Sequence, residues 1–251
     1  LPLASGRFRL DAAVDDPVLG WTARHKKAMI LARLDDTTEA IDMLERMVKE
    51  RSDDLSVASS LAELLRSEER YEDAREQYDK VIGQVEMLEA RHWPLLYARG
   101  ISLERLGEWR SAEADFLSAL ELNPNEPLVL NYLGYTWVDQ GVNLDAALGM
   151  IERAVEQRPE DGYMIDSLGW ALYRLGQYDE ATTWLEKAVE LKPEDPTIND
   201  HLGDVYWRIG RRLEAKFQWR HAISMGPEEE DLAQIHAKII DGMPAESVQN
   251  P

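Results

Sequence analysis

The stretch that decides the fold is residues 162–195, GYMIDSLGWALYRLGQYDEATTWLEKAVELKPED, and its pattern returns in residues 196–229. Gly169 of the first stretch, for example, is matched by Gly203 of the second, 34 residues later. A fixed period of this length is typical of stacked helical repeats, in which each unit packs its apolar face against the next. The period therefore favours an extended binding surface over a catalytic cleft.

The same spacing divides most of the chain into helical hairpins. Within 162–195, Ile165, Leu168 and Leu172 share one face of a first helix, and a turn follows at residues 175–177. A second helix then ends before Pro193, since proline is tolerated only in a first helical turn. The predicted units are 21–54, 55–88, 93–126, 127–161, 162–195 and 196–229.

Three segments flank these six units. Residues 1–20 are interpreted as an N-terminal lead, the end of a preceding truncated repeat. Residues 230–243 place Leu232, Ile235 and Ile239 on one helical face, so we expect a capping helix on the last repeat. Residues 244–251, PAESVQNP, are predicted to be a disordered tail.

The order of residues within a unit resembles the tetratricopeptide repeat. The matching residues are Leu168, Gly169, Ala181, Leu185, Ala188 and Pro193 in one unit, and Leu202, Gly203, Tyr206, Ala215, Trp219, Ala222 and Pro227 in the next. This resemblance implies an all-α fold, a right-handed superhelical solenoid of helix–turn–helix repeats. A glycine within a helix costs about 1 kcal/mol relative to alanine. Gly100, Gly134, Gly169 and Gly203 therefore predict close contact between helices.

A narrower resemblance concerns residues 130–141, 166–176 and 198–219, which look like the C-terminal half of bacterial envelope proteins built from these repeats. Some of those relatives are outer-membrane lipoproteins that bring substrates to a periplasmic protease. The resemblance implies a periplasmic or outer-membrane-associated adaptor, with a cytoplasmic location as the alternative. Because the chain begins at Leu1 and shows no signal peptide, we expect a fragment or a processed form.

Charge and composition exclude several classes of partner. The net charge is −20, from 48 acidic and 28 basic residues, which disfavours nucleic acid and anionic membrane surfaces. This charge is explained first by solubility, and the alternative is a partner with a basic surface. The chain has no cysteine, so it has neither disulfides nor thiolate metal sites. No apolar run approaches the roughly 20 residues of a membrane-spanning helix.

Motifs for catalysis are absent from the sequence. It contains no GxxxxGK[ST], HExxH or GxSxG pattern. His201 lies beside Asp200 and Asp204, but we interpret it as a hydrogen-bonded or solvated histidine and not as a metal ligand. We therefore expect no enzyme, no cofactor and no metal site.

A second stripe on the first helices of the last three units is the candidate binding surface. Its residues are Asn131, Tyr135, Asp166, Trp170, Tyr173, Arg174, Asp200, Asp204, Trp207 and Arg208. Spacings of three and four keep the members from each helix on one face. The family resemblance implies that this face lines a concave groove where peptides dock. Its aromatic and acidic character predicts a basic or basic-aromatic ligand, although Tyr173 and Trp207 can equally pack between repeats.

The sequence thus predicts a non-catalytic scaffold or adaptor for protein–protein interaction, with a monomer favoured. Two alternatives remain at this point. The first alternative is a structural module for self-association or spacing. The second is a regulatory part of a larger protein.

Overall fold

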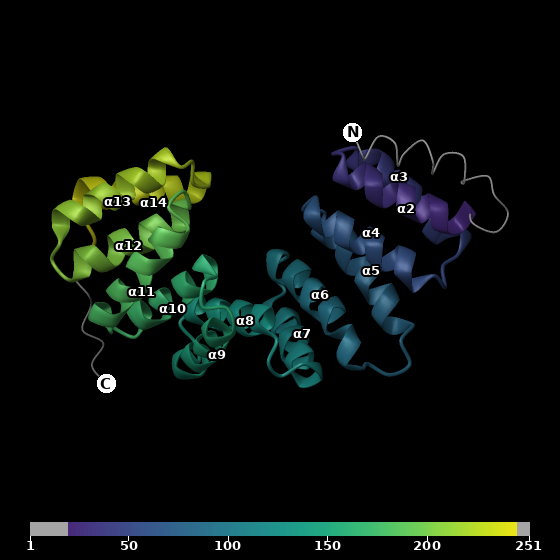
Figure 1. The fold of residues 1–251 in the computed structure, drawn as a ribbon, viewed down its shortest axis with the longest axis horizontal. Coiled ribbons are helices and arrows are strands. Elements are labelled where there is room, and N and C mark those ends of the chain that lie inside the picture. Colours follow the sequence, from purple (N-terminus) through teal and green to yellow (C-terminus); the bar gives the residue numbers. More distant parts are fainter. Residues whose placement is uncertain (1–19, 245–251) are drawn as a thin grey trace. The chain divides into compact units, whose positions relative to one another are not determined.

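The computed structural model describes residues 20–244, in which every regular element is a helix (Figure 1). The helices are α2 Gly20–Arg33, α3 Thr37–Glu50, α4 Leu55–Ser67, α5 Tyr71–Gly83, α6 Trp93–Arg105, α7 Trp109–Leu122, α8 Pro127–Gln140, α9 Leu144–Gln157, α10 Gly162–Arg174, α11 Tyr178–Leu191, α12 Pro196–Arg208, α13 Arg212–Ser224 and α14 Glu229–Asp241. A 3-10 helix, η1 (Ala90–His92), precedes α6. None of the helices between residues 20 and 244 has the length and hydrophobicity that a membrane-spanning helix needs. The predicted lead and tail lie outside the described residues, apart from Gly20 and Pro244.

The turn inside each helix pair contains a residue with a left-handed backbone near the end of the first helix, and the α8–α9 turn contains a second one, Asn143. In the last four pairs this residue is a glycine, such as Gly176 with a φ of +76°, and in the first two it is Asp35 or Glu69. Glycine adopts this conformation without the steric cost that a Cβ imposes. The turn predicted at residues 175–177 is confirmed between α10 and α11.

Aspartate and proline fix where several first helices begin. Asp161 accepts hydrogen bonds through Oδ1 from the N–H groups of Tyr163 and Met164 at the start of α10. Asp195 caps α12 in the same way, and Pro196 occupies the first turn of that helix. Such caps satisfy backbone amides that have no partner inside the helix, so each repeat restarts at a defined residue.

The predicted core stripe is confirmed. The stripe residues Ile165, Leu168 and Leu172 of α10 are at most 4% exposed. They face Ala181, Leu185 and Ala188 of α11, all of which are fully buried. The small alanines let the paired helices approach each other closely.

Close approach within a pair is also confirmed at the glycines of the first helices. A Cβ placed on Gly169 would lie 2.6 Å from Cγ of Leu185, well inside van der Waals contact. A Cβ placed on Gly100 would likewise come too close to Phe116, and one placed on Gly134 would come too close to Ile151. The helix cost of glycine is therefore offset by tight packing against the second helix.

The chain divides into two compact units, with the boundary between Pro124 and Asn125. The first unit holds α2–α7, and in it α4 contacts both α2 and α6. The second unit holds α8–α14, and in it α10 contacts both α8 and α12. In each unit the first helices of the pairs thus form one layer, and the second helices pack against it.

α14 covers the end of the second unit. It packs on α13, with Ile235 1% exposed and Leu232 and Ile239 half-buried. Lys238 of α14 also reaches two carboxylates of α12. α14 therefore stands where the first helix of a further repeat would stand.

Candidate functional site

The layer of first helices in the second unit carries all ten predicted binding residues. They are Asn131 and Tyr135 on α8, Asp166, Trp170, Tyr173 and Arg174 on α10, and Asp200, Asp204, Trp207 and Arg208 on α12. Their contacts divide them into two groups. Those near α8 line an open pocket, whereas those near α14 are bonded to other parts of the chain.

The open part is a pocket of about 250 Å³ between α8, α10 and the start of α12. Its lining comprises Asn131, Tyr132, Tyr135, Tyr163, Asp166, Ser167, Asp195, Thr197 and Ile198. Tyrosine rings offer apolar area together with a hydroxyl group that can hydrogen-bond. Tyr163 is 54% exposed, so this ring is accessible to a ligand. We call this site the α8–α12 pocket.

Four buried polar atoms of this layer have no hydrogen-bond partner among residues 20–244. They are Oδ1 of Asn131, Nε1 of Trp170, and Oδ1 of both Asn199 and Asp200, and among these four residues Asn131 lines the pocket. A buried polar group without a partner costs about 1–3 kcal/mol. Asn131 lines the α8–α12 pocket, but its oxygen is buried in the wall, so an N–H group of a ligand can supply the missing bond only once the side chain turns toward the pocket.

Trp170, which the sequence predicts to contact a partner, is half-buried and stacks on two neighbouring rings of the layer. Its ring centroid lies 4.7 Å from that of Tyr173 and 4.0 Å from that of His201, with nearly parallel planes. Tyr173 itself is only 8% exposed, so the alternative of packing applies to it. Tyr173 therefore mainly supports the layer, whereas part of the Trp170 ring stays exposed.

His201 and Asp166 form a buried pair between α12 and α10. The Nδ1 atom of His201 lies 3.0 Å from both carboxylate oxygens, and each residue is at most 6% exposed. Burial alone would lower the pKa of His201, but Asp166, with Asp200 and Asp204 nearby, outweighs burial and raises it. The residues between 20 and 244 contain no group of three acidic or histidine side chains that could hold a metal.

The raised pKa of His201 predicts a pH-dependent stability. The pKa of His201 is higher in the folded protein than in the unfolded chain, where it is about 6.5. The pair therefore stabilises the fold fully at pH values below 6.5, and this stabilisation is lost as the pH rises through the pKa of the folded protein. The free energy of unfolding of the parent should therefore exceed that of His201→Gln most at acidic pH. Urea denaturation of both proteins between about pH 5.5 and 9 measures the difference. A difference that stays constant over this range would rule out the charged pair.

The acidic residues nearest the C-terminus, Asp200 and Asp204, share one lysine within the chain. Nζ of Lys238 lies 2.7 Å from Oδ2 of Asp200 and 2.8 Å from Oδ1 of Asp204. Nε1 of Trp219 also donates a hydrogen bond to Asp204. Asp204 is 4% exposed, and burial together with Asp200 raises its pKa to about 6. Asp204 is therefore closed off in this arrangement, whereas the side chain of Asp200 is still 18% exposed.

The remaining predicted residues donate hydrogen bonds to backbone carbonyls of the chain. Nη1 of Arg174 donates to the carbonyl of Asp139 at 3.0 Å. Trp207 donates to Met243 and Arg208 to Pro244, at 3.2 and 2.7 Å. The stretch after α14 therefore engages the α12 end of the layer.

Sequence reasoning missed the tyrosines Tyr132 and Tyr163 of the pocket. It followed a single stripe along each helix, whereas the pocket forms where neighbouring stripes of three helices meet. The repeat spacing did contain a signal for the ion pairs that join neighbouring first helices. Asp166 and His201 are 35 residues apart, and Asp204 and Lys238 are 34 apart. Partners separated by about one repeat occupy adjoining first helices.

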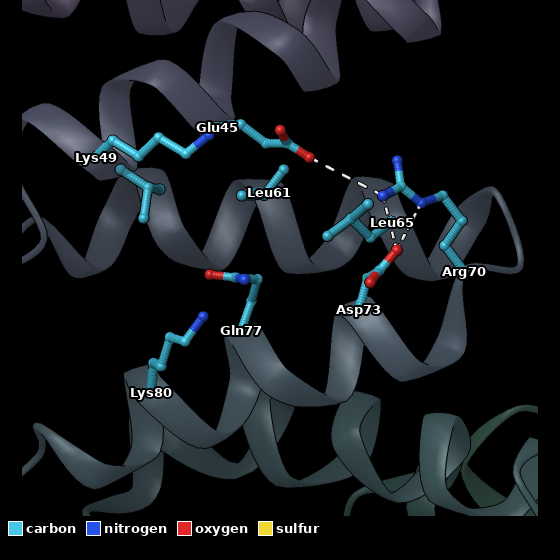
Figure 2. A pocket seen from close by; sticks show the side chains of 9 residues that line it. Glu45, Lys49, Leu61, Leu65, Arg70, Asp73, Gln77 and Lys80 are labelled. Carbon is cyan, nitrogen blue, oxygen red and sulfur yellow. Dashed lines mark hydrogen bonds and ion pairs between the residues drawn. The ribbon is translucent and has the colours of Figure 1, made fainter.

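A smaller pocket of about 190 Å³ lies in the first unit between α3, α4 and α5 (Figure 2). Leu61 and Leu65 line it, and Arg70 crosses its edge. Figure 2 shows Arg70 reaching Asp73 and Glu45, at 2.7 and 3.9 Å. Ion pairs this exposed contribute little to stability. Because its charges pair with each other, this pocket is a weaker candidate than the α8–α12 pocket.

Family comparison agrees with the helix pairs. A model described as tetratricopeptide repeat matches residues 9–86 and 97–161, and one described as TPR repeat matches residues 169–210. The chain belongs to the tetratricopeptide repeat family. Repeats of this family generally form non-catalytic scaffolds for protein–protein interaction, so this tetratricopeptide repeat chain is an interaction scaffold in that general sense.

Individual relatives share the repeat architecture over different lengths. A TPR repeat-containing protein of Pseudomonas aeruginosa is 32% identical over 87 residues, which are 35% of this chain and 15% of that protein. The crystal structure of a tetratricopeptide repeat protein from Parabacteroides merdae aligns with 93% of this chain and 90% of its own, at 19% identity and a TM-score of 0.70. YrrB, a TPR protein with an unusual peptide-binding site, aligns with 73% of this chain and 92% of its own, at 20% identity and a TM-score of 0.57.

Proposed function

We propose that this tetratricopeptide repeat protein binds a segment of a partner protein in the α8–α12 pocket. The observation that carries the proposal is the unpaired Oδ1 of Asn131 beside a pocket lined by three tyrosines. An extended peptide supplies backbone N–H groups for the amide oxygen, and its side chains supply apolar area for the rings. YrrB, whose fold is similar, has a peptide-binding site of its own, which supports the proposal.

A basic residue in the partner segment fits the charges of this pocket. Asp166 and Asp195 line it, and the chain as a whole carries a charge of −20. Asp166 is buried and paired with His201, so the more exposed Asp195 is the carboxylate that a cation can approach. The partner proposed here is accordingly a basic or basic-aromatic segment, recognised at the α8–α10 end of the layer. Asp200 and Asp204 take no part in this recognition.

We further propose that the protein serves as an adaptor in the bacterial envelope. The support is the resemblance of residues 130–141, 166–176 and 198–219 to envelope proteins built from these repeats. The similar segment of a Pseudomonas aeruginosa protein shows that bacterial proteins carry related repeats. Fractionation of cells that produce the complete gene product tests the location, and recovery in the cytoplasm would contradict it.

Removal of one ring tests the pocket directly. A peptide array probed with the parent protein identifies a binding segment, and the dissociation constant of that segment is then measured with Tyr135→Ala. We expect about tenfold weaker binding, because the ring supplies contact area at the centre of the pocket. Asn131→Leu should weaken binding as well, since it removes the acceptor for the peptide backbone.

Thr183→Ala is the control for this experiment, because Thr183 is exposed on the second helix α11. It should leave the dissociation constant unchanged. Binding that survives both pocket substitutions, but weakens with changes on second helices, would show that the partner binds elsewhere. A stable homo-oligomer that buries Tyr135 would instead favour a role in self-association.

A further inference from the structure

The outer face of α13 carries an apolar pair that no other second helix has. Leu213 is 84% exposed and Phe217 is 65% exposed. Residues four apart on a helix lie on the same side, so the two side chains form one patch. The opposite side of α13 is anchored by Trp219, which is fully buried. The patch is therefore additional to the residues that hold the helix in place.

Comparison of the six repeats shows how unusual this pair is. Leu213 and Phe217 are the second and sixth residues of α13. The residues at these two positions are Thr38 and Asp42 in α3, Glu72 and Glu76 in α5, Arg110 and Ala114 in α7, Asp145 and Gly149 in α9, and Asp179 and Thr183 in α11. All of these are polar or small, as solvent-facing positions of a repeat require. The repeat fold itself thus gives no reason for a leucine and a phenylalanine here.

Basic side chains surround the apolar pair. Lys216 follows Leu213 by three positions and Arg220 follows Phe217 by three, so each shares the side of its apolar neighbour. Neither Lys216 nor Arg220 forms an ion pair with any residue between 20 and 244. The ring of Phe217 stacks on His221, with centroids 6.3 Å apart. This arrangement is a fixed apolar patch with free cations beside it, on a protein of net charge −20.

We propose that Leu213, Lys216, Phe217 and Arg220, the α13 patch, form a second docking surface, which binds an acidic amphipathic helix of another protein. Apolar side chains of that helix would cover Leu213 and Phe217, and its carboxylates would pair with Lys216 and Arg220. A second copy of the chain is a poorer occupant, because a twofold contact through this patch brings like charges together. An anionic membrane is also a poorer occupant, because the negative net charge of the chain repels an anionic surface.

A synthetic amphipathic helix tests the proposal. The probe has leucine or phenylalanine at every third or fourth position and glutamate elsewhere, and its counterpart has lysine in place of glutamate. Fluorescence anisotropy measures binding of each peptide to the full chain. We expect the acidic helix to bind, and to bind about tenfold more weakly to Leu213→Asp/Phe217→Thr, which restores the residues of the preceding repeat. Lys216→Glu/Arg220→Glu should weaken binding of the acidic helix to a similar extent.

Control measurements separate this surface from the α8–α12 pocket. Tyr135→Ala should bind the acidic helix as the parent does, and both patch variants should keep the parent melting temperature because none of the changed residues is buried. Equal binding of the acidic and basic helices, or unchanged binding by the patch variants, would overturn the proposal. So would tight binding to vesicles containing phosphatidylglycerol, or a dimer that Leu213→Asp/Phe217→Thr converts to a monomer.

Discussion

Replacing Lys238 with methionine should lower the free energy of unfolding by about 3 kcal/mol, which is the usual cost of removing one partner of a buried ion pair. Nζ of Lys238 lies within 3 Å of Asp200 and Asp204, and the side chain of Asp204 is only 5% exposed. Without the ammonium group, two carboxylates remain close together, and only the indole N–H of Trp219 hydrogen-bonds to Asp204. Urea denaturation at neutral pH measures the loss.

The effect of Lys238→Met should depend on pH. Burial and Asp200 raise the pKa of Asp204 to about 6 even with Lys238 in place, and loss of the cation raises this pKa further. Protonation removes the repulsion, so the deficit should shrink as pH falls through the pKa of Asp204. Adding Asp200→Asn should recover part of the lost stability at neutral pH. Lys216→Met, which breaks no ion pair among the described residues, should change stability by less than about 0.5 kcal/mol. A deficit that is equal at acidic and neutral pH would contradict this account.

Gly169→Leu should also lower the free energy of unfolding by about 3 kcal/mol, the upper part of the range for overpacked cores. The first side-chain atom alone would come within 2.6 Å of Cγ of Leu185 and 3.2 Å of its backbone nitrogen. A backbone atom cannot rotate away as a side-chain end can, so α10 and α11 must separate. Differential scanning calorimetry of the variant reports the change as a lowered melting temperature.

Gly149→Leu is the matched control, because a Cβ at Gly149 would meet nothing within 4 Å. This residue lies in α9 of the same unit, and leucine forms helices better than glycine does. We expect the control to leave stability unchanged or to raise it by up to about 1 kcal/mol. Equal losses for the two variants would show that helix contact does not explain the glycine in α10.

The sequence alone was sufficient to predict the helices, the turns and the core. Leu168 and Gly169 recur one period later as Leu202 and Gly203, and each unit packs only on its neighbours, so burial follows from position in the repeat. The stripe on α14 was visible for the same reason, because Leu232, Ile235 and Ile239 follow the periodicity of a helix. Local spacing determines which side of a helix is apolar, and this side becomes the core.

The tertiary structure alone decided which residues of the predicted surface are free. Trp170 stacks on His201, and Asp204 binds Lys238, although the spacing of Trp170 and Asp204 equally suits binding to a partner. These contacts depend on how far one first helix is rotated and shifted against the next, which hydrophobic periodicity does not specify. Asn131 and Tyr135 remain at an open pocket because the helix beside them, α10, turns its aromatic residue Trp170 toward α12. Periodicity thus determined which helical face forms the layer, and packing between repeats determined which part of that layer a partner can reach.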